Sequence, residues 1–584
     1  MNRKPFRLSR KALFGIAVLA AAGALPVQAA TIAVTTFVDE DGTEGDASTG
    51  CSLREAVLSV NAGQDVGGCA AAVATDAYGT NDTILLDDGS YTLTLHGSDE
   101  IGVAGVDGGL PTVDVTPLAE IGDLDITKSV TIRGTGSGAT TIQWADQAER
   151  DRIFHVYATS GTINFGLQGV ALKQGQTVQE CTFLVGETTY CLRRAGGAIA
   201  VGLAARMVDP TVSGKDTGGG GGSRRPENPG EEETGADYTL SLTDVVVEGN
   251  EAAGDGGGIY NGAPMTATNV RVLGNVALTN GGGIYNEGVS TIADSTISGN
   301  IAEGGGGIFV TGASPVTIRG STINGNRAVG GGALSGRSGV LVNVVNSTLS
   351  GNLARDVGAG FYHNGPATLN FVTIANNISG ADSANAGSGI NTFQSGSVLV
   401  FVKNTLVAAN KKGWTYTADE DYRDTTIPIP LPDDPAFTFG DSNCGATGSG
   451  NPAIQSGGFN LSSDGTCAAV LNQATDLHGI DPKIGILADN GGPTFTHALA
   501  ADSPALGKGG FELLITVDQR GETRDNPPDI GAFELVTVAP PPAPTTGGGG
   551  GGCAVGGEGR LDPTLPAMLA AALALFGWRR RAVK

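Results

Sequence analysis

An asparagine recurs at a nearly constant interval through the middle of this 584-residue chain. It closes a short phrase, such as Thr296-Ile297-Ser298-Gly299-Asn300, and successive copies are 25 or 26 residues apart. The six asparagines of this set are Asn250, Asn275, Asn300, Asn326, Asn352 and Asn377. A phrase with paired glycines, Gly282-Gly283-Ile284-Tyr285 in one copy, recurs between them. Intervals this regular indicate a solenoid of stacked units.

The residues within each repeat favour strands over helices. β-Branched residues alternate with polar ones, as in Ser290 to Ile297, whereas a helical repeat needs apolar residues at 3.6 spacing and few glycines. Glycine makes up 94 residues without the triplet period of collagen. Short strands separated by Gly and Asn turns predict an all-β fold, a right-handed parallel β-helix with about 25 residues per coil and coils about 4.8 Å apart.

The repeated turn residues are interpreted as structural. Asparagine tolerates left-handed backbone conformations, and its side chain bonds to backbone groups. Stacked at equivalent positions, Asn250 through Asn377 are expected to form an internal ladder. The glycine pairs fit sharp corners where a Cβ would clash. A ligand-binding role is the less favoured alternative for these asparagines.

The period assigns the β-helix to residues 121–410, with one earlier coil near Thr162–Val170 and a last one near Asn404–Asn410. Two insertions interrupt it. Residues 207–237, rich in glycine and charge, are expected to be disordered. The insertion 411–441 carries Trp414, Tyr416 and Tyr422 and is the candidate ligand-binding loop, because loops on rigid scaffolds often carry function. A surface loop that covers the end of the helix is the alternative.

Residues 1–29 have the form of a signal peptide, with basic residues, a short apolar run and Val27-Gln28-Ala29 before the expected cleavage point. Six cysteines of the predicted exported body lie in three close pairs. Their spacing predicts local disulfides rather than zinc sites: Cys51 with Cys69, Cys181 with Cys191, and Cys444 with Cys467.

A Pro/Gly linker, residues 538–552, leads to Cys553, and a short apolar stretch and three arginines follow within residues 553–584. This arrangement resembles the tripartite C-terminal sorting signals of Gram-negative bacteria, in which an intramembrane protease removes the tail. The resemblance implies that Cys553 is a candidate for lipid attachment. A simple membrane anchor that leaves the body outside is the alternative.

The chain is acidic, with a formal net charge of −24. This charge argues against nucleic acid as a partner, since phosphate binding needs a basic face. A diffuse affinity for calcium is compatible with it, but no calcium site can be located, and no cofactor is predicted.

Cys51-Ser52-Leu53-Arg54-Glu55-Ala56 closely resembles the N-terminal CSLREA motif of exported β-helix proteins, and it is assigned to a cap region of residues 30–120. The segment Asp123–Gly134 looks like the first coils of such proteins. The resemblance implies a short helix in which Arg54 and Glu55 serve as salt-bridge and hydrogen-bond partners.

Several ordered motifs in residues 442–537 are similar to the choice-of-anchor Q domain. They are Leu487–Thr494, His497-Ala498-Leu499, Asp518-Gln519-Arg520-Gly521 and Asp529–Glu534. The resemblance implies a C-terminal β-rich extension and a surface location. It supplies no catalytic residues, so none is assigned, and His497 and Asp489 are expected to be structural hydrogen-bond partners.

An enzymatic role is the alternative, because many β-helices cleave acidic polysaccharides. A pectin lyase-like site needs carboxylates that hold calcium together with a basic residue, and an inverting hydrolase needs two carboxylates on adjacent coils. No stacked row of carboxylates is formed by Asp255, Asp294, Glu303 and Asp356. The positions equivalent to His363 on other coils are Asn261 and Asn286, which are not carboxylates, so His363 is expected at a surface or turn.

The favoured prediction is therefore an exported, non-catalytic protein anchored at its C-terminus to the cell surface or outer membrane. Its expected partners are the cell envelope, a sorting protease, and extracellular carbohydrate or a neighbouring or host surface in adhesion. An anchored polysaccharide lyase or glycoside hydrolase is the alternative, and a purely structural envelope component is a third option.

Overall fold

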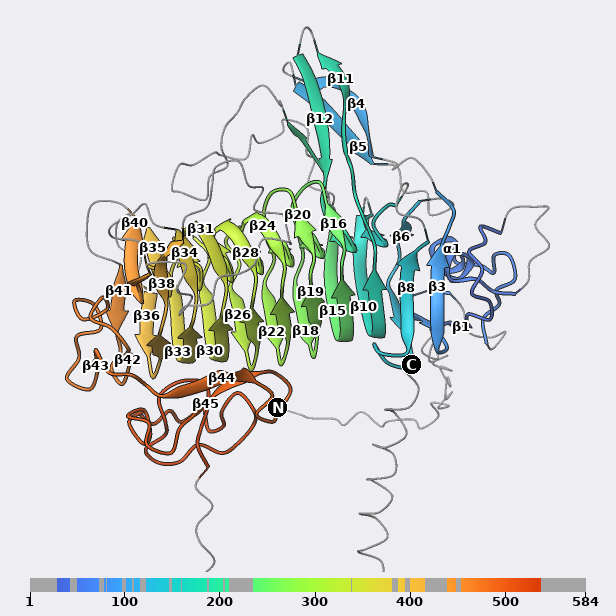
Figure 1. Cartoon of the computed structure of the whole chain (residues 1–584). Helices are drawn as coiled ribbons and strands as arrows, with labels where there is room; N and C mark the ends of the chain where they lie inside the picture. The colour runs from blue at the N-terminus through green and yellow to red at the C-terminus, as the bar shows by residue number, and fades with distance from the viewer. Residues whose placement is uncertain are drawn as a thin grey trace, which may run out of the picture. The chain divides into compact units, whose positions relative to one another are not determined.

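Strands from successive coils lie side by side, parallel and in register. Ile259 of β17 (Ile259–Asn261) pairs with Ile284 of β21 (Ile284–Asn286), and Ile284 pairs with Ile308 of β25 (Ile308–Val310). Each step across the sheet therefore advances the chain by one repeat. The predicted right-handed parallel β-helix is confirmed, and its strands form three long sheets around one core (Figure 1).

The structure is a computed structural model. It describes residues 29–42, 50–72, 78–79, 81–96, 101–107, 110–115, 122–145, 150–158, 160–185, 188–202, 205–208, 235–337, 339–380, 387–393, 400–414, 439–447 and 453–536. Within these residues, no helix combines the length and the apolar character that a membrane span requires.

The widest sheet has twenty strands, because most coils contribute two strands or one long bent strand to it. Its strands are β1 (Thr31–Ala33), β2 (Asp82–Leu85), β3 (Gly89–Leu93), β7 (Val130–Arg133), β8 (Thr140–Trp144), β10 (Ser160–Lys173), β15 (Gly235–Glu248), β18 (Met265–Thr268), β19 (Arg271–Leu273), β22 (Ser290–Ala293), β23 (Thr296–Ser298), β26 (Val316–Arg319), β27 (Thr322–Asn324), β30 (Val342–Ser350), β33 (Ala367–Ala375), β36 (Val400–Lys403), β37 (Leu406–Ala408), β41 (Ile454–Ser456), β42 (Leu461–Ser462) and β43 (Leu477–His478).

The other two long sheets complete each coil. The ten-stranded sheet consists of β6 (Leu124–Ile126), β9 (Phe154–Val156), β13 (Ile199–Val201), β17, β21, β25, β29 (Leu334–Gly336), β32 (Phe361–His363), β35 (Ile390–Phe393) and β40 (Cys444–Thr447). The eight-stranded sheet consists of β16 (Glu251–Ala252), β20 (Val276–Ala277), β24 (Ile301–Gly304), β28 (Arg327–Gly330), β31 (Leu353–Val357), β34 (Ile378–Gly380), β38 (Lys411–Trp414) and β39 (Gly440–Asp441).

Left-handed residues make the corner between the widest and the eight-stranded sheet. Gly274 takes φ +60° immediately before Asn275, and glycine avoids the steric cost of this conformation. One coil uses Asn376 instead, at φ +58°, because asparagine also tolerates it. The glycine pairs stand at the next corner, where a Cβ on Gly257 would lie 2.4 Å from the Gly282 carbonyl oxygen. The glycine pairs therefore stand at a crowded corner as expected, whereas the left-handed position belongs to the residue before each ladder asparagine and not to the asparagine itself.

The interior of the tube is a continuous apolar column. The inward residue of the middle coils is Val272, Ile297, Ile323, Leu349 and Ile374 in succession, and all are buried. Because each coil packs only against its neighbours, the ends need covers.

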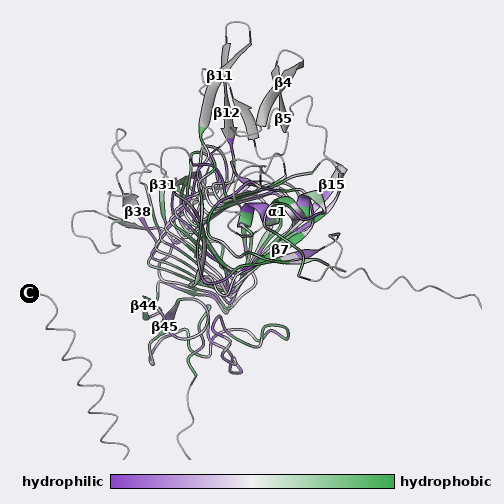
Figure 2. Ribbon diagram, turned by 90° about the vertical axis from the view of Figure 1, so that its right-hand side faces the viewer, coloured by the Kyte–Doolittle hydropathy of each residue, from purple (hydrophilic) through white to green (hydrophobic). Residues whose placement is uncertain are grey.

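A helix, α1 (Leu53–Ala62), lies at the N-terminal end of the tube (Figure 2). Ser52 caps it, and a capping box joins the Ser52 and Glu55 side chains to each other's backbone N–H groups. Arg54 Nε lies 2.8 Å from Asp39 Oδ1. The predicted helix and the structural roles of Arg54 and Glu55 are confirmed.

The stack extends beyond the predicted limits of 121–410 at both ends. β2 pairs in parallel with β7, and β40 pairs in parallel with β35. β41, β42 and β43 add further parallel strands to the widest sheet. Insertions had blurred the period in these regions, so the sequence pattern underestimated the length of the tube.

Insertions also form small antiparallel sheets. β4 (Ile101–Asp107) pairs with β5 (Leu110–Val115), and β11 (Gln179–Val185) pairs with β12 (Thr188–Arg194), which pairs with β14 (Ala205–Val208). Both sheets project from the tube (Figure 1). Most of the predicted disordered insertion, residues 209–234, lies outside the described residues.

Residues 479–536, called the extension below, fold back along the outer face of the widest sheet (Figure 1). Thr322 Oγ1 donates to the Phe495 carbonyl oxygen at 2.6 Å, and Asn346 Nδ2 donates to that of Val517 at 2.7 Å. The extension has one hairpin, β44 (Ile484–Ala488) with β45 (Thr496–Leu499), and is otherwise irregular. The predicted β-rich region, residues 442–537, thus has strands β40 to β43 in its first part, and side-chain contacts hold most of its second part in place.

Candidate functional site

The repeated asparagines form a ladder inside the tube. Asn275 Nδ2 donates to Asn300 Oδ1 at 2.9 Å and to the Val247 carbonyl oxygen at 2.9 Å, while the Asn275 backbone N–H donates to the same Asn300 oxygen at 2.9 Å. The pattern repeats from Asn250 through Asn377 and continues to Asn410 and Asn443. These side chains are buried and fully engaged, so they offer no ligand site.

Two of the three expected disulfides are present. Cys51 bonds to Cys69 beside α1, and Cys444 bonds to Cys467 near the other end of the stack. Cys181 and Cys191 lie in the paired strands β11 and β12, whose side chains are outside the described residues, so their bond stays a prediction.

The predicted ligand loop and anchor fall largely outside the described residues. Trp414 ends β38, but the structure does not describe its side chain. Tyr416, Tyr422 and Cys553 lie in undescribed segments. Their roles stay predictions.

His363 is not at a surface or turn, and that expectation was wrong. It is the last residue of β32, points into the tube and is 1% exposed. Its Nε2 lies 3.0 Å from the Val340 carbonyl oxygen, and burial lowers the pKa of the imidazole. Gly336 on the preceding coil leaves the space for the ring, because a Cβ there would lie 2.1 Å from His363 Nδ1.

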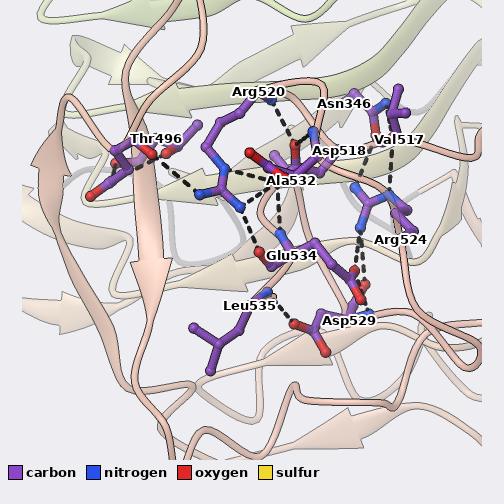
Figure 3. A network of polar contacts seen from close by, with 12 residues as sticks. Asn346, Thr496, Val517, Asp518, Arg520, Arg524, Asp529, Ala532, Glu534 and Leu535 are labelled. Atoms are coloured by element: carbon purple, nitrogen blue, oxygen red, sulfur yellow. Dashed lines mark hydrogen bonds and ion pairs between the residues drawn. The ribbon is translucent and has the colours of Figure 1, made fainter. Parts of the chain in front are cut away.

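The extension contains a dense buried polar network centred on Arg524 and Glu534 (Figure 3). Arg524 Nη1 lies 3.1 Å from Glu534 Oε2, and its Nη2 donates to Asn346 Oδ1 at 2.9 Å and to the Gly531 carbonyl oxygen at 3.0 Å. Burial lowers the pKa of Arg524 to about 10, and Glu534 opposes that shift. Burial also raises the pKa of Glu534, although two backbone N–H groups and Arg524 stabilise its charge.

Arg524 also covers an unusual residue of the tube. The widest sheet bends once per coil at a left-handed residue, which is Asp294, Gly320 and Asn346 in successive coils and Phe371 in the next. A bulky residue rarely takes φ +56°, and such a conformation costs about 1–3 kcal/mol. The Arg524 guanidinium lies 3.8 Å from the centre of the Phe371 ring and offsets part of this cost through a cation–π contact.

Three further polar residues of this region, Gln519, His497 and Asp489, also make hydrogen bonds. Gln519 accepts from Thr348 Oγ1 at 2.6 Å and donates to Thr322 Oγ1 at 2.9 Å. His497 is buried, with Nε2 2.8 Å from Ser350 Oγ and Nδ1 2.7 Å from the Gly485 carbonyl oxygen, and burial lowers its pKa. Asp489 Oδ1 accepts from the Gly491 N–H at 3.0 Å. Gln519 and His497 thus fix the extension to the tube, and Asp489 stabilises a local turn, as expected for structural hydrogen-bond partners.

A groove of about 430 Å³ lies between the tube and the extension. The tube contributes Asp294, Arg319, Gly320, Val345 and Asn346, and the extension contributes Pro493 and residues 514–521. The Asp294 and Arg319 side chains are 36% and 55% exposed, and their nearest charged atoms are 4.0 Å apart. They are the accessible charged pair of this groove.

Exposed apolar side chains gather on the extension. Eight of the fourteen large apolar residues that the described chain exposes lie between Ile480 and Val536. Leu514 is 93% exposed and lines the groove, while Phe495 and Phe511 are 51% and 58% exposed. Exposed apolar groups gathered in one region often mark an interaction surface.

The stacked aromatic residues of the tube do not form such a surface. Tyr260, Tyr285 and Phe309 follow one another on the outer side of the ten-stranded sheet, with ring centres 5.3 and 5.5 Å apart. Their rings are nearly parallel, at 8° and 5°, and all three residues are buried. Because each ring faces its neighbour, these residues stabilise the coils and leave no free platform for a sugar.

An acidic cluster that the sequence pattern did not reveal lies at the N-terminal end of the same sheet. Asp123, Asp125 and His155 each present a ligand atom within 4.8 Å of the others, and all three are buried. Asp125 pairs in register with His155 on the next strand. The Asp-Leu-Asp alternation could have placed both carboxylates on one side of a strand, but the irregular first coils concealed the alignment with His155.

Comparisons with known proteins find only distant resemblances. No protein-family model matches the chain, and no curated protein matches it. A solved structure of pectate lyase Pel9A is 13% identical, covers 87% of this chain and 97% of its own, and superposes with a TM-score of 0.42. The A-module of mannuronan C-5 epimerase AlgE6 from Azotobacter vinelandii is 13% identical. The match covers 65% of this chain and 91% of the A-module, with a TM-score of 0.28. The strand register establishes the fold, and these resemblances add nothing on substrate or mechanism.

Proposed function

We propose that the protein is exported, anchored to the cell surface, and contacts extracellular carbohydrate through the groove between the tube and the extension without cleaving it. The groove combines one accessible charged pair with exposed apolar side chains at its edge. Carbohydrates present hydroxyl groups along ring edges and C–H groups on ring faces. Arg319 would donate hydrogen bonds to these hydroxyl groups, and Asp294 would accept hydrogen bonds from them. Leu514 would pack against the C–H groups of the ring faces.

The proposal that the protein does not cleave carbohydrate rests on the hydrogen bonds of the carboxylates that line the groove. Asp518 lines the groove, but its oxygens accept from three backbone N–H groups and from Arg520 Nε at 2.9 Å. Asp294 is then the one carboxylate lining the groove that is outside this network. An inverting glycosidase needs two available carboxylates about 6.5–9.5 Å apart. The rival proposal, an anchored lyase or hydrolase, would have to place its chemistry elsewhere.

Removal of the Arg319 guanidinium is expected to weaken carbohydrate binding. Hydrogen bonds to a charged group contribute about 1.5–3 kcal/mol, so Arg319→Ala should weaken binding about tenfold to a hundredfold. A glycan array with the mature chain would identify the ligand, and titration calorimetry would then measure the loss. The matched control is Arg355→Ala, since Arg355 is a half-exposed arginine that pairs with Asp356 on another part of the tube. Equal affinities for the two variants would refute the groove as the binding site.

Anchoring depends on the predicted C-terminal signal. Replacement of Cys553 by serine should release the body into the medium if this thiol carries the attached lipid. Cell fractionation and immunoblotting would measure the distribution, with the parent chain as reference. Unchanged retention in the membrane fraction would favour a simple apolar anchor instead.

A further inference from the structure

We propose that Asp123, Asp125 and His155 form a zinc site at the N-terminal end of the tube. Asp125 lies in β6, Asp123 lies just before β6, and His155 lies in the adjacent strand β9. They lie beside α1, where Asn61 Nδ2 donates to the Asp125 carbonyl oxygen at 2.7 Å and Arg54 Nη1 donates to that of Asp123 at 3.3 Å. The site therefore lies where the cap meets the first strands of the ten-stranded sheet.

The first supporting observation is the carboxylate of Asp125. The residue is 1% exposed, and neither of its side-chain oxygens accepts a hydrogen bond from the described residues. A buried carboxylate without a compensating partner is strongly unfavourable, which favours a bound cation beside it. His155 Nδ1 lies 3.4 Å from Asp125 Oδ1, so both atoms can reach one ion.

The second observation is the orientation of His155. Its Nε2 lies 3.3 Å from the Gly202 carbonyl oxygen, which can only accept a hydrogen bond. Nε2 is therefore the nitrogen that donates to this carbonyl group, and Nδ1 faces the Asp125 carboxylate. Metal-bound histidines are held in the same way, with the outer nitrogen donating to a carbonyl group.

The distance between His155 Nδ1 and Asp125 Oδ1 also fits a shared metal ion. A value of 3.4 Å is longer than an ordinary N–H···O hydrogen bond, which is about 2.7–3.2 Å. Two ligands about 2.0–2.1 Å from one tetrahedral zinc ion lie about 3.3–3.4 Å apart. The strand register thus already sets the spacing that the ion requires.

Local charge supports a divalent ion. Asp123 Oδ2 lies 2.8 Å from Arg152 Nε, and Asp151 Oδ1 lies 3.9 Å from the same atom. Arg54 is matched by Asp39. The carboxylates of Asp123 and Asp151 thus share the Arg152 guanidinium, and a zinc ion would add positive charge beside the Asp125 carboxylate. The imidazole favours zinc over calcium, because calcium prefers six to eight oxygen ligands.

The test is a zinc titration of the untagged mature chain after treatment with a chelator. We expect one zinc per chain with a raised Tm, and much weaker binding of calcium and magnesium. Asp125→Asn should weaken zinc binding at least tenfold. The matched control is Asp464→Asn, because Asp464 is a buried carboxylate whose oxygens already accept from Asn443 and Thr466.

X-ray absorption of the zinc-loaded parent chain keeps the proposal testable if a variant fails to fold. We expect a shell with one imidazole nitrogen and carboxylate oxygens at about 2.0–2.1 Å. Absence of stoichiometric zinc, a shell without imidazole, or equal zinc affinity in Asp125→Asn would overturn the proposal.

Discussion

Replacement of Arg524 by alanine is expected to detach the extension from the tube. The change removes hydrogen bonds to Glu534, Asn346 and Gly531 and leaves the Glu534 carboxylate buried without its cation. Breaking a buried pair on one side costs about 3–5 kcal/mol. The guanidinium contact with Phe371, which sits at a strained backbone position, is lost as well.

Denaturant unfolding and limited proteolysis of residues 479–536 would measure this effect. Lys483→Ala is the matched control, because Lys483 belongs to the same extension but makes an exposed ion pair with Asp502. It should leave the unfolding free energy unchanged. The double change Arg524→Met with Glu534→Leu should recover much of the loss, since it removes both buried charges. A single Arg524 variant as stable as the Lys483 control would show that the network does not hold the extension.

The second large effect is expected inside the tube, at Asn326. Alanine at this position removes the acceptor of two Asn300 donors, the backbone N–H and Nδ2, and removes the donor to the Ile297 carbonyl oxygen. Each buried polar group left without a partner costs about 1–3 kcal/mol, so we expect a total of about 3–5 kcal/mol.

The first residue of the ladder provides the control for this prediction. Asn250→Ala deprives only one donor, the Gly175 N–H, of its acceptor, so its cost should be clearly smaller. Urea titrations of both variants would compare them. Equal losses at Asn250 and Asn326 would mean that the ladder contributes as separate turns rather than as one connected row.

The repeat made the tube predictable because one physical pattern governed each coil. Asparagine beside a left-handed corner, glycine at a crowded corner and alternating β-branched residues all favour the same stacked strands. Where the period broke, the prediction failed in detail. The strands β2 and β40 belong to the stack, but insertions next to them hid their alignment.

Much less of the candidate site could be predicted, because it depends on contacts between distant segments. Phe371 is visible in the sequence as the exception in a row of Asn, Asp and Gly, yet only the fold shows Arg524 over its ring. The same holds for the groove, which joins Arg319 to Leu514 across the two segments. His363 was misplaced because the adjacent coils carry Gly336 and Thr392 at the same register, and neither residue type marks an inward position in a strand.

The most direct test of the central claim is to incubate the mature chain with the carbohydrate that the array identifies, and with acidic polysaccharides, in the presence and absence of calcium. Size-exclusion chromatography and assays for reducing and unsaturated ends would follow the polymer. The account predicts that the carbohydrate is retained by the protein at its original length. New ends that appear with the native chain and not with the heat-denatured one would contradict it.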